Sequence, residues 1–150
     1  MKEPTLRPAA PGDIAALLAL QSTYYAEDRY AFVESMAREG WHSLLSDANL
    51  GSAWVFEADS TLVGYVVLTL GYSLEYRGRD AFLDELYVTP DWRGRGLGRR
   101  ALEVVDSACS RLGVNALHLE VENDKSGAIA LYRKWGFAEH RRVLMTKEVT

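Results

Sequence analysis

Cysteine is almost absent from this chain, since Cys109 is the only one among 150 residues. No internal disulfide can form, so the fold has to rest on its apolar core. Cys109 falls inside a predicted helix, where we expect it to pack as a small side chain and not to act as a nucleophile. Histidine is also scarce: His42, His118 and His140 lie far apart, without the close spacing of metal-ligand sets. We therefore predict no metal site.

Long apolar runs are missing as well. No stretch approaches the roughly 20 apolar residues that a bilayer-crossing helix needs, and the first residues, 1–4, do not form an apolar signal segment. These two absences predict a cytoplasmic location and no membrane partner. The net charge of −4 disfavours a nucleic-acid partner, because such partners attract basic surfaces.

What the chain does have is an ordinary globular balance, with 48% hydrophobic and 25% charged residues. Its length predicts one domain, over 1–150, with a full core. Apolar periodicity predicts strands over 5–7, 52–58, 62–70, 82–88 and 116–121, and one long or two short strands over 137–149. Helices are predicted from an N-cap at Asp13, over 24–47 with a break near Gly40, and over 97–112 and 126–135. This order predicts an α/β fold with a mixed central sheet flanked by helices on both faces.

The most informative segment is a glycine-rich turn, Arg93-Gly94-Arg95-Gly96-Leu97-Gly98, between a predicted strand and a predicted helix. Glycine lets the backbone come close to a ligand because it has no Cβ. A helix that begins here directs free N–H groups and the positive end of its dipole outward, which favours phosphate. Arg93, Arg95, Arg99 and Arg100 add cationic side chains that can bind phosphate oxygens. The segment therefore predicts a pyrophosphate-binding turn.

Two other phosphate-binding patterns fit this turn poorly. A Walker A loop needs a Gly-Lys-Ser/Thr ending, which the turn does not have. A dinucleotide-binding turn needs Gly-x-Gly-x-x-Gly, whereas here Gly98 comes one position too early and Arg99 stands where that pattern requires glycine or alanine. Nucleotide binding stays an alternative, and it predicts an affinity for ATP or NAD similar to that for coenzyme A. The other alternative is a solvent-exposed turn whose arginines serve solubility.

Two motifs connect the turn to a known family. Arg93, Gly96 and Gly98 occupy the fixed positions of Arg/Gln-x-x-Gly-x-Gly/Ala, and residues 128–137 match Ala-x-x-Leu-Tyr-x-x-x-Gly-Phe. Through these motifs the chain resembles the GCN5-related N-acetyltransferase (GNAT) family, most clearly over 63–137. The resemblance implies the GNAT fold and an acyltransferase reaction, in which an acetyl group moves from acetyl-CoA to a primary amine. Acetyl-CoA is thus the expected co-substrate.

The resemblance also implies which residues bind the cofactor. Backbone groups of Leu86, Tyr87 and Val88 are expected to pair with the pantetheine amides, as an added strand would. The pyrophosphate is expected to lie on the turn and on Arg99, with N–H groups supplied by Arg93, Gly94, Arg95, Gly96, Leu97 and Gly98. Seven residues before the motif tyrosine, this chain has Lys125 where the family commonly has asparagine. Asn123 is the candidate substitute for that contact.

The resemblance implies that Tyr132, the tyrosine of the second motif, contacts coenzyme A and donates a proton to its sulfur. A phenol with a pKa near 10 is protonated at pH 7 and can therefore donate. The alternative is a tyrosine that only packs in the core.

The attacking amine must lose a proton, so the reaction needs a base. Glu120 resembles the glutamate of the branch that acetylates ribosomal-protein N-termini. Asp84 or Glu85 resembles the acidic residue of the diamine acetyltransferase branch. Each of the three has the alternative of a solvated or ion-paired carboxylate, and a relayed water with no dedicated base is the further candidate.

The acceptor is predicted from charge. Glu27 and Asp28 lie in the first helical connection, which lines the acceptor side in the resembled family, and their charge would attract a cationic amine such as a polyamine or an aminoglycoside. The alternative is ordinary surface charge. Five tyrosines are candidates for the wall of an amine pocket by cation–π contact: Tyr24, Tyr25, Tyr30, Tyr72 and Tyr76.

We therefore predict an N-acetyltransferase for a small cationic amine. The alternatives are an acetyltransferase for protein N-termini or lysines, whose substrate is a peptide amine, and a non-catalytic acyl-CoA-binding module that regulates a partner. The resemblance further implies a homodimer.

Overall fold

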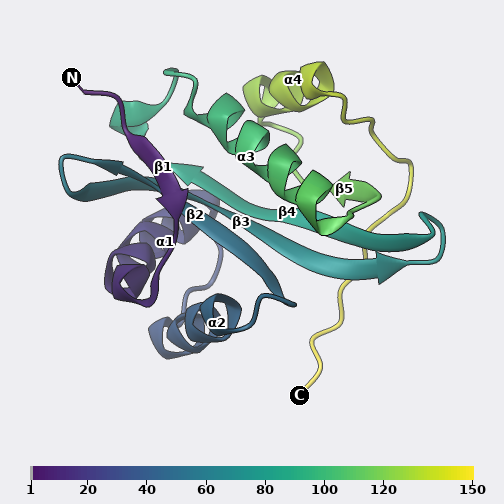
Figure 1. Ribbon diagram of the computed structural model, residues 1–150, viewed down its shortest axis with the longest axis horizontal. Helices are drawn as coiled ribbons and strands as arrows, with labels where there is room; N and C mark the ends of the chain where they lie inside the picture. Colours follow the sequence, from purple (N-terminus) through teal and green to yellow (C-terminus); the bar gives the residue numbers. More distant parts are fainter. Residues whose placement is uncertain (1) are drawn as a thin grey trace. The chain divides into compact units, whose positions relative to one another are not determined.

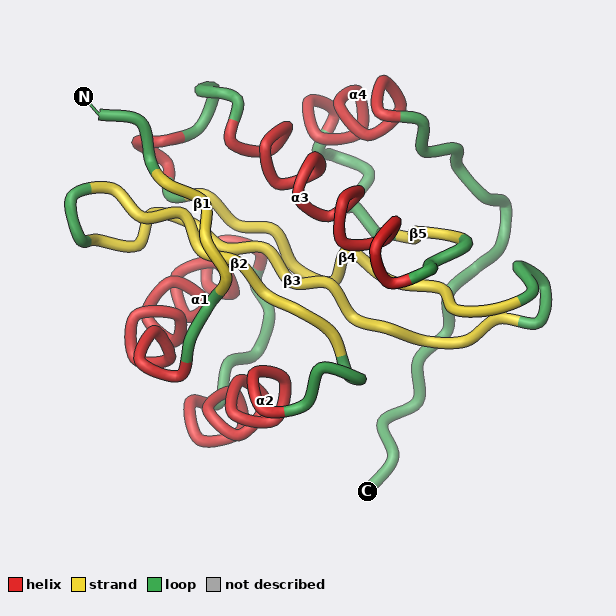
Figure 2. Tube along the Cα trace, viewed as in Figure 1, coloured by secondary structure: helices red, strands yellow, loops and turns green. Residues whose placement is uncertain are grey.

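The computed structural model describes residues 2–150 (Figure 1). The chain divides into two compact units, Met1–Glu120 and Val121–Thr150. Among the described residues, the first unit contains the whole β-sheet and three α-helices, and the second contains one further α-helix. Figure 2 separates the helices, strands and loops of each unit by colour. That the whole chain forms one domain stays a prediction.

The sheet of the first unit has five strands in the order β1-β2-β3-β4-β5. Their bounds are Thr5–Pro8 for β1, Gly51–Ala58 for β2, Thr61–Ser73 for β3, Gly78–Val88 for β4 and Ala116–His118 for β5. The first four strands pair antiparallel, and β5 runs parallel to β4. The sheet is therefore mixed, which confirms the predicted α/β class.

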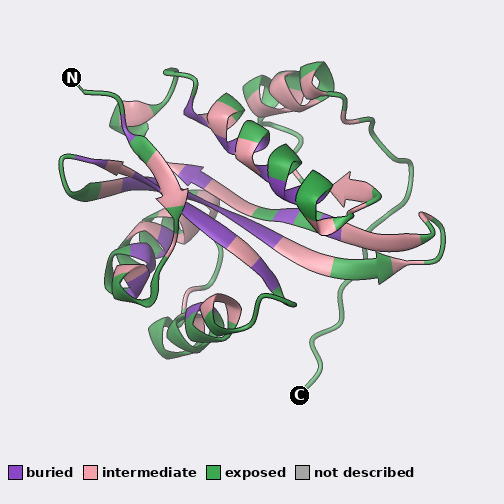
Figure 3. Cartoon of the chain, viewed as in Figure 1, coloured by how far each residue is buried: buried purple, intermediate pink, exposed green. Residues whose placement is uncertain are grey.

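Helices cover both faces of this sheet (Figure 1). Helices α1 (Ile14–Asp28) and α2 (Glu34–Ser46) lie on one face, and α3 (Leu97–Leu112) lies on the other. Because both faces are covered, β2 and β3 carry continuous buried runs where an exposed sheet would alternate. Figure 3 shows the buried residues concentrated on these central strands and on the inner sides of the helices.

A β-bulge interrupts the pairing of β3 with β4. Val67 pairs with Glu85, but the next pair is Leu68 with Leu83, so Asp84 is one extra residue on β4. Consecutive side chains on a regular strand point to opposite faces, and a bulge breaks this alternation. Asp84 and Glu85 consequently both line a pocket on the α1–α2 face.

Two of the predicted elements differ from the observed ones in the first unit. The break predicted near Gly40 is wrong: α2 runs through Gly40, and the two helices separate at 29–33, where Arg29 has a φ of 62°. A glycine costs a helix about 1 kcal/mol relative to alanine, and burial of the next residue, Trp41, offsets that cost. Strand β5 ends at His118, three residues earlier than predicted.

The second unit contains α4 (Ser126–Trp135), with the predicted bounds, and Gly136 ends it with a φ of 110°. The strands predicted over 137–149 are wrong, because residues 137–150 have no secondary structure. Their alternating apolar residues favour an extended chain, but a strand also requires a hydrogen-bonded neighbour, and these residues pair with no strand. No helix within residues 2–150 combines the length and the apolar composition that spanning a membrane requires.

Candidate active site

The glycine-rich turn has the backbone geometry of an open anion site. Gly94 and Gly96 have φ values of 74° and 81°, in the left-handed region that favours glycine. A Cβ at either residue would meet no atom within 4 Å, so backbone conformation, not crowding, requires glycine in this ligand-free turn. Gly96 is the N-cap of α3, and no side chain caps the helix. The N–H groups of the first turn of α3 are therefore available to an anion.

Arg93 is fixed by three contacts around the end of β4. Its Nε donates to the carbonyl oxygen of Val88 at 2.9 Å, and its terminal nitrogen donates to Glu27 at 2.8 Å. Its guanidinium also lies 5.5 Å from the ring centre of Tyr87. Glu27 accepts a second bond, from the Tyr87 hydroxyl at 3.1 Å. Glu27, predicted as an acceptor-binding residue, thus connects the end of α1 to the turn.

The other arginines divide into two kinds. Arg95 lies over the Trp92 ring at 4.9 Å, and the exposed Arg99 is 3.6 Å from Glu103 in a solvent-screened ion pair. Both remain at the turn and able to reach an anion. Arg100 instead donates to the carbonyl oxygen of Pro4 at 2.9 Å and covers the ring of Phe56. Its role in the structure is therefore to anchor the N-terminal segment.

One edge of β4 is open beside the turn. Strand β5 pairs only with 80–82 of β4, whereas β3 pairs along the other edge of β4 as far as Val88. Within the first unit no strand pairs with the β5-side edge of Leu86, Tyr87 and Val88. An extended ligand with amide groups could pair with such an edge.

Glu85 lies at the centre of a hydrogen-bonded cluster. Its carboxylate accepts from the hydroxyl of Tyr25 at 2.5 Å and from the hydroxyl of Tyr65 at 2.6 Å. The Gln21 amide adds two longer contacts, at 3.3 and 3.4 Å. Burial raises the pKa of Glu85, and the bonds from the two tyrosines offset part of that increase. Burial also raises the pKa of both phenols, which therefore remain protonated donors.

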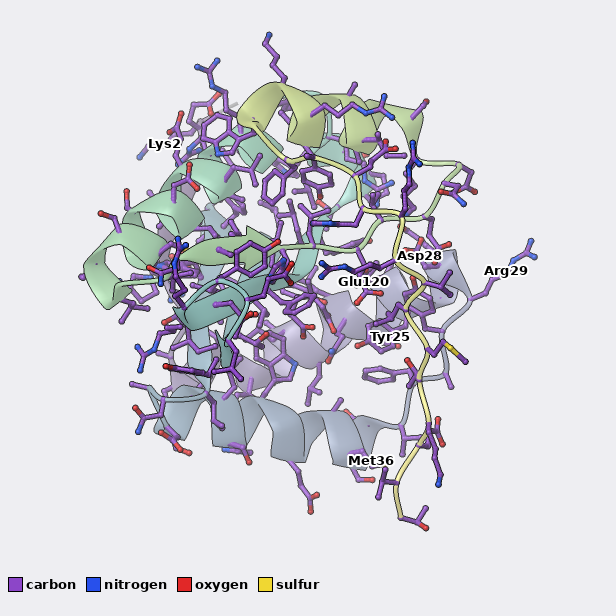
Figure 4. All side chains as sticks on the ribbon, turned by 90° about the vertical axis from the view of Figure 1, so that its right-hand side faces the viewer. Lys2, Tyr25, Asp28, Arg29, Met36 and Glu120 are labelled. Atoms are coloured by element: carbon purple, nitrogen blue, oxygen red, sulfur yellow. The ribbon has the colours of Figure 1, made fainter. Side chains whose placement is uncertain are left out.

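Trp41 sets the orientation of the Gln21 side chain. The indole N–H of Trp41 donates to the Gln21 side-chain oxygen at 2.9 Å, which directs the amide nitrogen toward Glu85. Gln21 is 8% exposed and Trp41 is buried with it, so this hydrogen bond is shielded from water. In Figure 4, Tyr25 lies among the side chains inside the unit, whereas Arg29, at the end of α1, extends outward.

A pocket of about 310 Å³ lies next to this cluster, between α2 and the strands. Asp84 and Glu85 both line it, with Trp41 and Val67 among the apolar residues. The Asp84 side chain is open to solvent, yet the protein atoms around it desolvate the carboxylate and raise its pKa. Among the described residues Asp84 has no hydrogen-bond or ion-pair partner. The pocket therefore has one carboxylate that is hydrogen-bonded within the protein and one that is free.

The remaining predicted residues lie outside this cluster. Glu120 is exposed and follows the end of β5. Asp28 is the last residue of α1. Asn123 and Lys125 precede α4 in the second unit, with Lys125 at its N-cap. The structure thus brings together Asp84 and Glu85 from the predicted set, and joins Glu27 to the turn.

Tyr132 belongs to α4 of the second unit. Its ring packs edge-on against Phe137, with 5.8 Å between the ring centres. Burial raises the pKa of the Tyr132 hydroxyl, which keeps it protonated at neutral pH. Its role as a proton donor to coenzyme A stays a prediction.

Sequence reasoning missed three members of the Glu85 cluster. The sequence analysis assigns no functional role to Gln21, Trp41 or Tyr65, which the structure places in this cluster. A signal was available for Gln21, because a polar residue stands where the periodicity of α1 requires a buried one. Among the described residues no group of three or more His, Cys, Asp or Glu side chains could hold a metal.

The comparisons with known proteins show the family to which the chain belongs. The pattern of the acetyltransferase (GNAT) family matches residues 15–137. The chain is 29% identical over 147 residues to aminoglycoside N(6′)-acetyltransferase type 1 of Stenotrophomonas maltophilia, with 94% of this chain and 90% of that protein covered. Integron cassette protein HFX_CASS3, from the mobile metagenome of Cole Harbour Salt Marsh, has a solved structure that is 36% identical, with a TM-score of 0.86 over 97% of this chain and 90% of that one. Aminoglycoside N-acetyltransferase AAC(6′)-Iy in complex with CoA shares the fold, with a TM-score of 0.82 at 14% identity over 97% of this chain and 94% of that one.

Some relatives are much longer than the chain. It is 39% identical over 122 residues, or 73% of its own length, to the Mycobacterium leprae protein ML0378, but it spans only 31% of that protein. It is 26% identical over 141 residues, or 93% of its own length, to the N-acetyltransferase MJ1207 of Methanocaldococcus jannaschii, and it spans 62% of that protein. The chain thus covers less than two thirds of the length of both relatives.

Proposed function

Because the chain belongs to the acetyltransferase (GNAT) family, we propose that it is an acetyl-CoA-dependent N-acetyltransferase that acts on the primary amine of a small cationic molecule. Membership confirms the resemblance carried by the two motifs and the predicted enzyme class, an acyltransferase. The cofactor, the acceptor and the roles of individual residues are the parts that we propose.

The observation that carries the proposal is the arrangement along β4. One strand presents two carboxylates to a pocket at Asp84 and Glu85, then an open backbone edge at 86–88, and then leads into the glycine-rich turn at 93–98, whose helix has no side-chain cap. A transferase needs these three features in this neighbourhood: a base for the amine, a binding edge for the donor, and a phosphate site that anchors the donor.

Acetyl-CoA fits the last two features. Its pantetheine arm carries amides that could pair with the open edge of Leu86, Tyr87 and Val88, and its pyrophosphate suits the first N–H groups of α3. Arg95 and Arg99 are placed to add charge-assisted bonds to that pyrophosphate. The solved complex of AAC(6′)-Iy with CoA supports this choice of donor. Asn123 and Tyr132, in the second unit, are proposed to contact the same cofactor.

The chemistry begins with a proton on the acceptor. An alkylammonium has a pKa of roughly 10 and has to be deprotonated before it attacks the thioester. Glu85 is proposed as the acceptor of that proton, directly or through a water, because burial raises its pKa and its position is fixed by Tyr25 and Tyr65. Asp84 and Glu120 remain candidates for the same role. Tyr132 is proposed to protonate the departing thiolate.

Thiol release from acetyl-CoA, measured with a panel of amines, tests the proposal. Removal of a general base or acid typically costs about 10²- to 10⁴-fold in rate, so Glu85→Gln and Tyr132→Phe should each lose well over tenfold in kcat. Both variants should still show a rise in melting temperature with coenzyme A.

Glu39→Gln and Tyr72→Phe are the matched controls, because both residues are exposed and neither lines the pocket, although Tyr72 was a sequence-based candidate for its wall. If coenzyme A stabilises the protein but no amine releases thiol, the chain is a non-catalytic acyl-CoA-binding module. If ATP or NAD binds as well as coenzyme A, the turn is a nucleotide site and the proposal is wrong.

A further inference from the structure

The pocket beside Glu85 is lined mainly by apolar residues on one side and by two carboxylates on the other. Its apolar part comes from α2 and the strands and includes Ala37, Trp41, Leu44, Leu50 and Val67. No lysine or arginine lines it. Its negative charge comes from two adjacent residues at the β-bulge. The pocket therefore has an acidic end and an extended apolar wall.

Two of the polar groups that line the pocket, the Glu85 carboxylate and the Gln21 amide, are already hydrogen-bonded to the protein. The donors that hold Glu85 are two phenols and an amide, all of them neutral, so its charge is solvated but has no cationic partner. The Gln21 oxygen is taken by the indole of Trp41. Among the described residues, Asp84 is the charged group that faces the pocket without a partner, and the hydroxyl-bearing residues Ser43 and Thr69 line the pocket as well. A ligand therefore finds one free anionic group, and mainly carbon on the opposite wall.

The size of the pocket limits the ligand further. Pockets that enclose drug-sized ligands usually measure about 300–1,000 Å³, so a volume of about 310 Å³ is at the lower end. A ligand with many hydroxyl groups would find few neutral polar partners in the pocket beyond Ser43 and Thr69, and hydroxyl groups left unpaired against the apolar residues are unfavourable. The same argument disfavours a second or third ammonium group on a polyamine.

From these observations we propose that the acceptor is a primary amine on a compact apolar body, such as an alkylamine or an arylalkylamine, with its ammonium on Asp84 and its body against α2. This proposal rests on the proposed acetyltransferase function and narrows its substrate class. In this assignment Asp84 is a binding residue that selects the cation, and Glu85 takes the proton. The aminoglycosides named for two of the similar proteins are expected to be poor acceptors for this chain.

The test is a homologous series of acceptors, assayed by thiol release from acetyl-CoA. Ethylamine, butylamine, hexylamine and phenethylamine have similar ammonium groups and differ in apolar size. Burying one methylene is worth about a threefold to fourfold change in equilibrium, so kcat/KM should rise by roughly that factor per methylene until the pocket is full. Spermidine and kanamycin are the comparison acceptors, and both should be at least about tenfold poorer than phenethylamine.

Two variants test which end of the pocket binds the ammonium group and which end binds the apolar body of the acceptor. Asp84→Asn should raise KM for ethylamine and phenethylamine alike, by about tenfold or more, because it removes the charge that both share. Gly40→Leu should impair phenethylamine and spare ethylamine, since a side chain at Gly40 has open space and lines the pocket. The controls are Asp59→Asn, at an exposed turn residue with a φ of 48° that asparagine tolerates, and Glu39→Leu, the neighbouring position on α2 outside the pocket.

The outcomes separate the two proposals. Preference for kanamycin or spermidine over phenethylamine, or a flat alkylamine series, would overturn the apolar-amine assignment while leaving the transferase function intact. Binding of phenethylamine in calorimetry that Gly40→Leu abolishes, without thiol release, would support the pocket assignment and contradict the transferase function. Equal effects of Asp84→Asn and Asp59→Asn would remove Asp84 from the site.

Discussion

The bond from Tyr65 to Glu85 gives the sharpest quantitative test of the site. Tyr65→Phe keeps the buried ring and removes only the hydroxyl that donates to Glu85 at 2.6 Å. A hydrogen bond between neutral groups contributes about 1 kcal/mol to stability, and one to a charged group about 1.5–3 kcal/mol. The variant should therefore lose about 1 kcal/mol where Glu85 is protonated and about 2 kcal/mol where it is ionised.

The pH dependence follows from the sign of the pKa shift. Because the pKa of Glu85 is raised in the folded protein, its contribution to stability is greatest below the unfolded value and falls as the pH rises through the folded value. Loss of the Tyr65 hydroxyl raises that folded pKa further. A difference of about 1 kcal/mol corresponds to about 0.7 pKa unit. The acidic limb of kcat/KM should move upward by the same amount.

The assay is urea unfolding of the wild type and the variant at several values between pH 4 and pH 8. Tyr72→Phe, on the same strand but 74% exposed, serves as the control and should follow the wild type throughout. A destabilisation by Tyr65→Phe that is the same at every pH would refute the reasoning, because the hydroxyl would then not bind an ionisable group. Direct titration of Glu85 by NMR would check the pKa change itself.

Further predictions concern the backbone and the turn. Gly64→Ala should destabilise the fold by about 2 kcal/mol or more in urea unfolding, since its Cβ would lie 2.6 Å from the carbonyl oxygen of Tyr87. Gly40→Ala, which has open space in a helix, should be neutral or should stabilise the fold by up to about 1 kcal/mol. Equal effects of the two substitutions would contradict the packing argument. Gly96→Ala should cost roughly 1–2 kcal/mol from its φ of 81° alone and should weaken coenzyme A binding in calorimetry; unchanged binding would exclude the turn from the cofactor site. Glu27→Gln should change the free energy of unfolding by less than about 1 kcal/mol, because the ion pair of Glu27 with Arg93 is partly exposed. The same substitution should alter coenzyme A affinity severalfold, because it releases Arg93. An unchanged affinity would mean that Arg93 does not take part in cofactor binding.

The helices were the most predictable part of the fold. Helices α3 and α4 have the predicted bounds because glycines in left-handed conformations, Gly113 and Gly136, end them and because their apolar spacing is regular. The break between α1 and α2 was misplaced, since Arg29 supplies the left-handed residue there and a non-glycine gives no such signal. Gly40 was taken as the break, although a glycine inside a helix needs only tertiary packing to be tolerated.

The site was predictable only where it lies in continuous sequence. The turn and its glycines follow from one motif, whereas the pairing of a ligand with residues 86–88 is an implication of the family resemblance and stays a prediction. The Glu85 cluster does not follow from one motif, because Tyr25, Tyr65 and Gln21 come from other elements and meet Glu85 only after the sheet and α1 have packed. Sequence left Asp84 and Glu85 as equivalent candidates. In the structure the Glu85 carboxylate is hydrogen-bonded and the Asp84 carboxylate is free. This difference depends on the register shift in the pairing of β4 with β3, which the sequence does not reveal.

That register shift is the physical link between the two halves of the site. On a strand without a bulge, the side chains of two consecutive residues point to opposite faces of the sheet. Only one of the carboxylates at 84 and 85 could then face α1 and α2. A bulge also increases the local twist of its strand, and it lies next to the stretch where β4 loses β5 as a partner. A single inserted residue thus places two carboxylates in one pocket, directly before the strand edge that β5 leaves unpaired. Deletion of Asp84 should therefore impair both amine binding and coenzyme A binding, whereas Asp84→Asn should impair only the first.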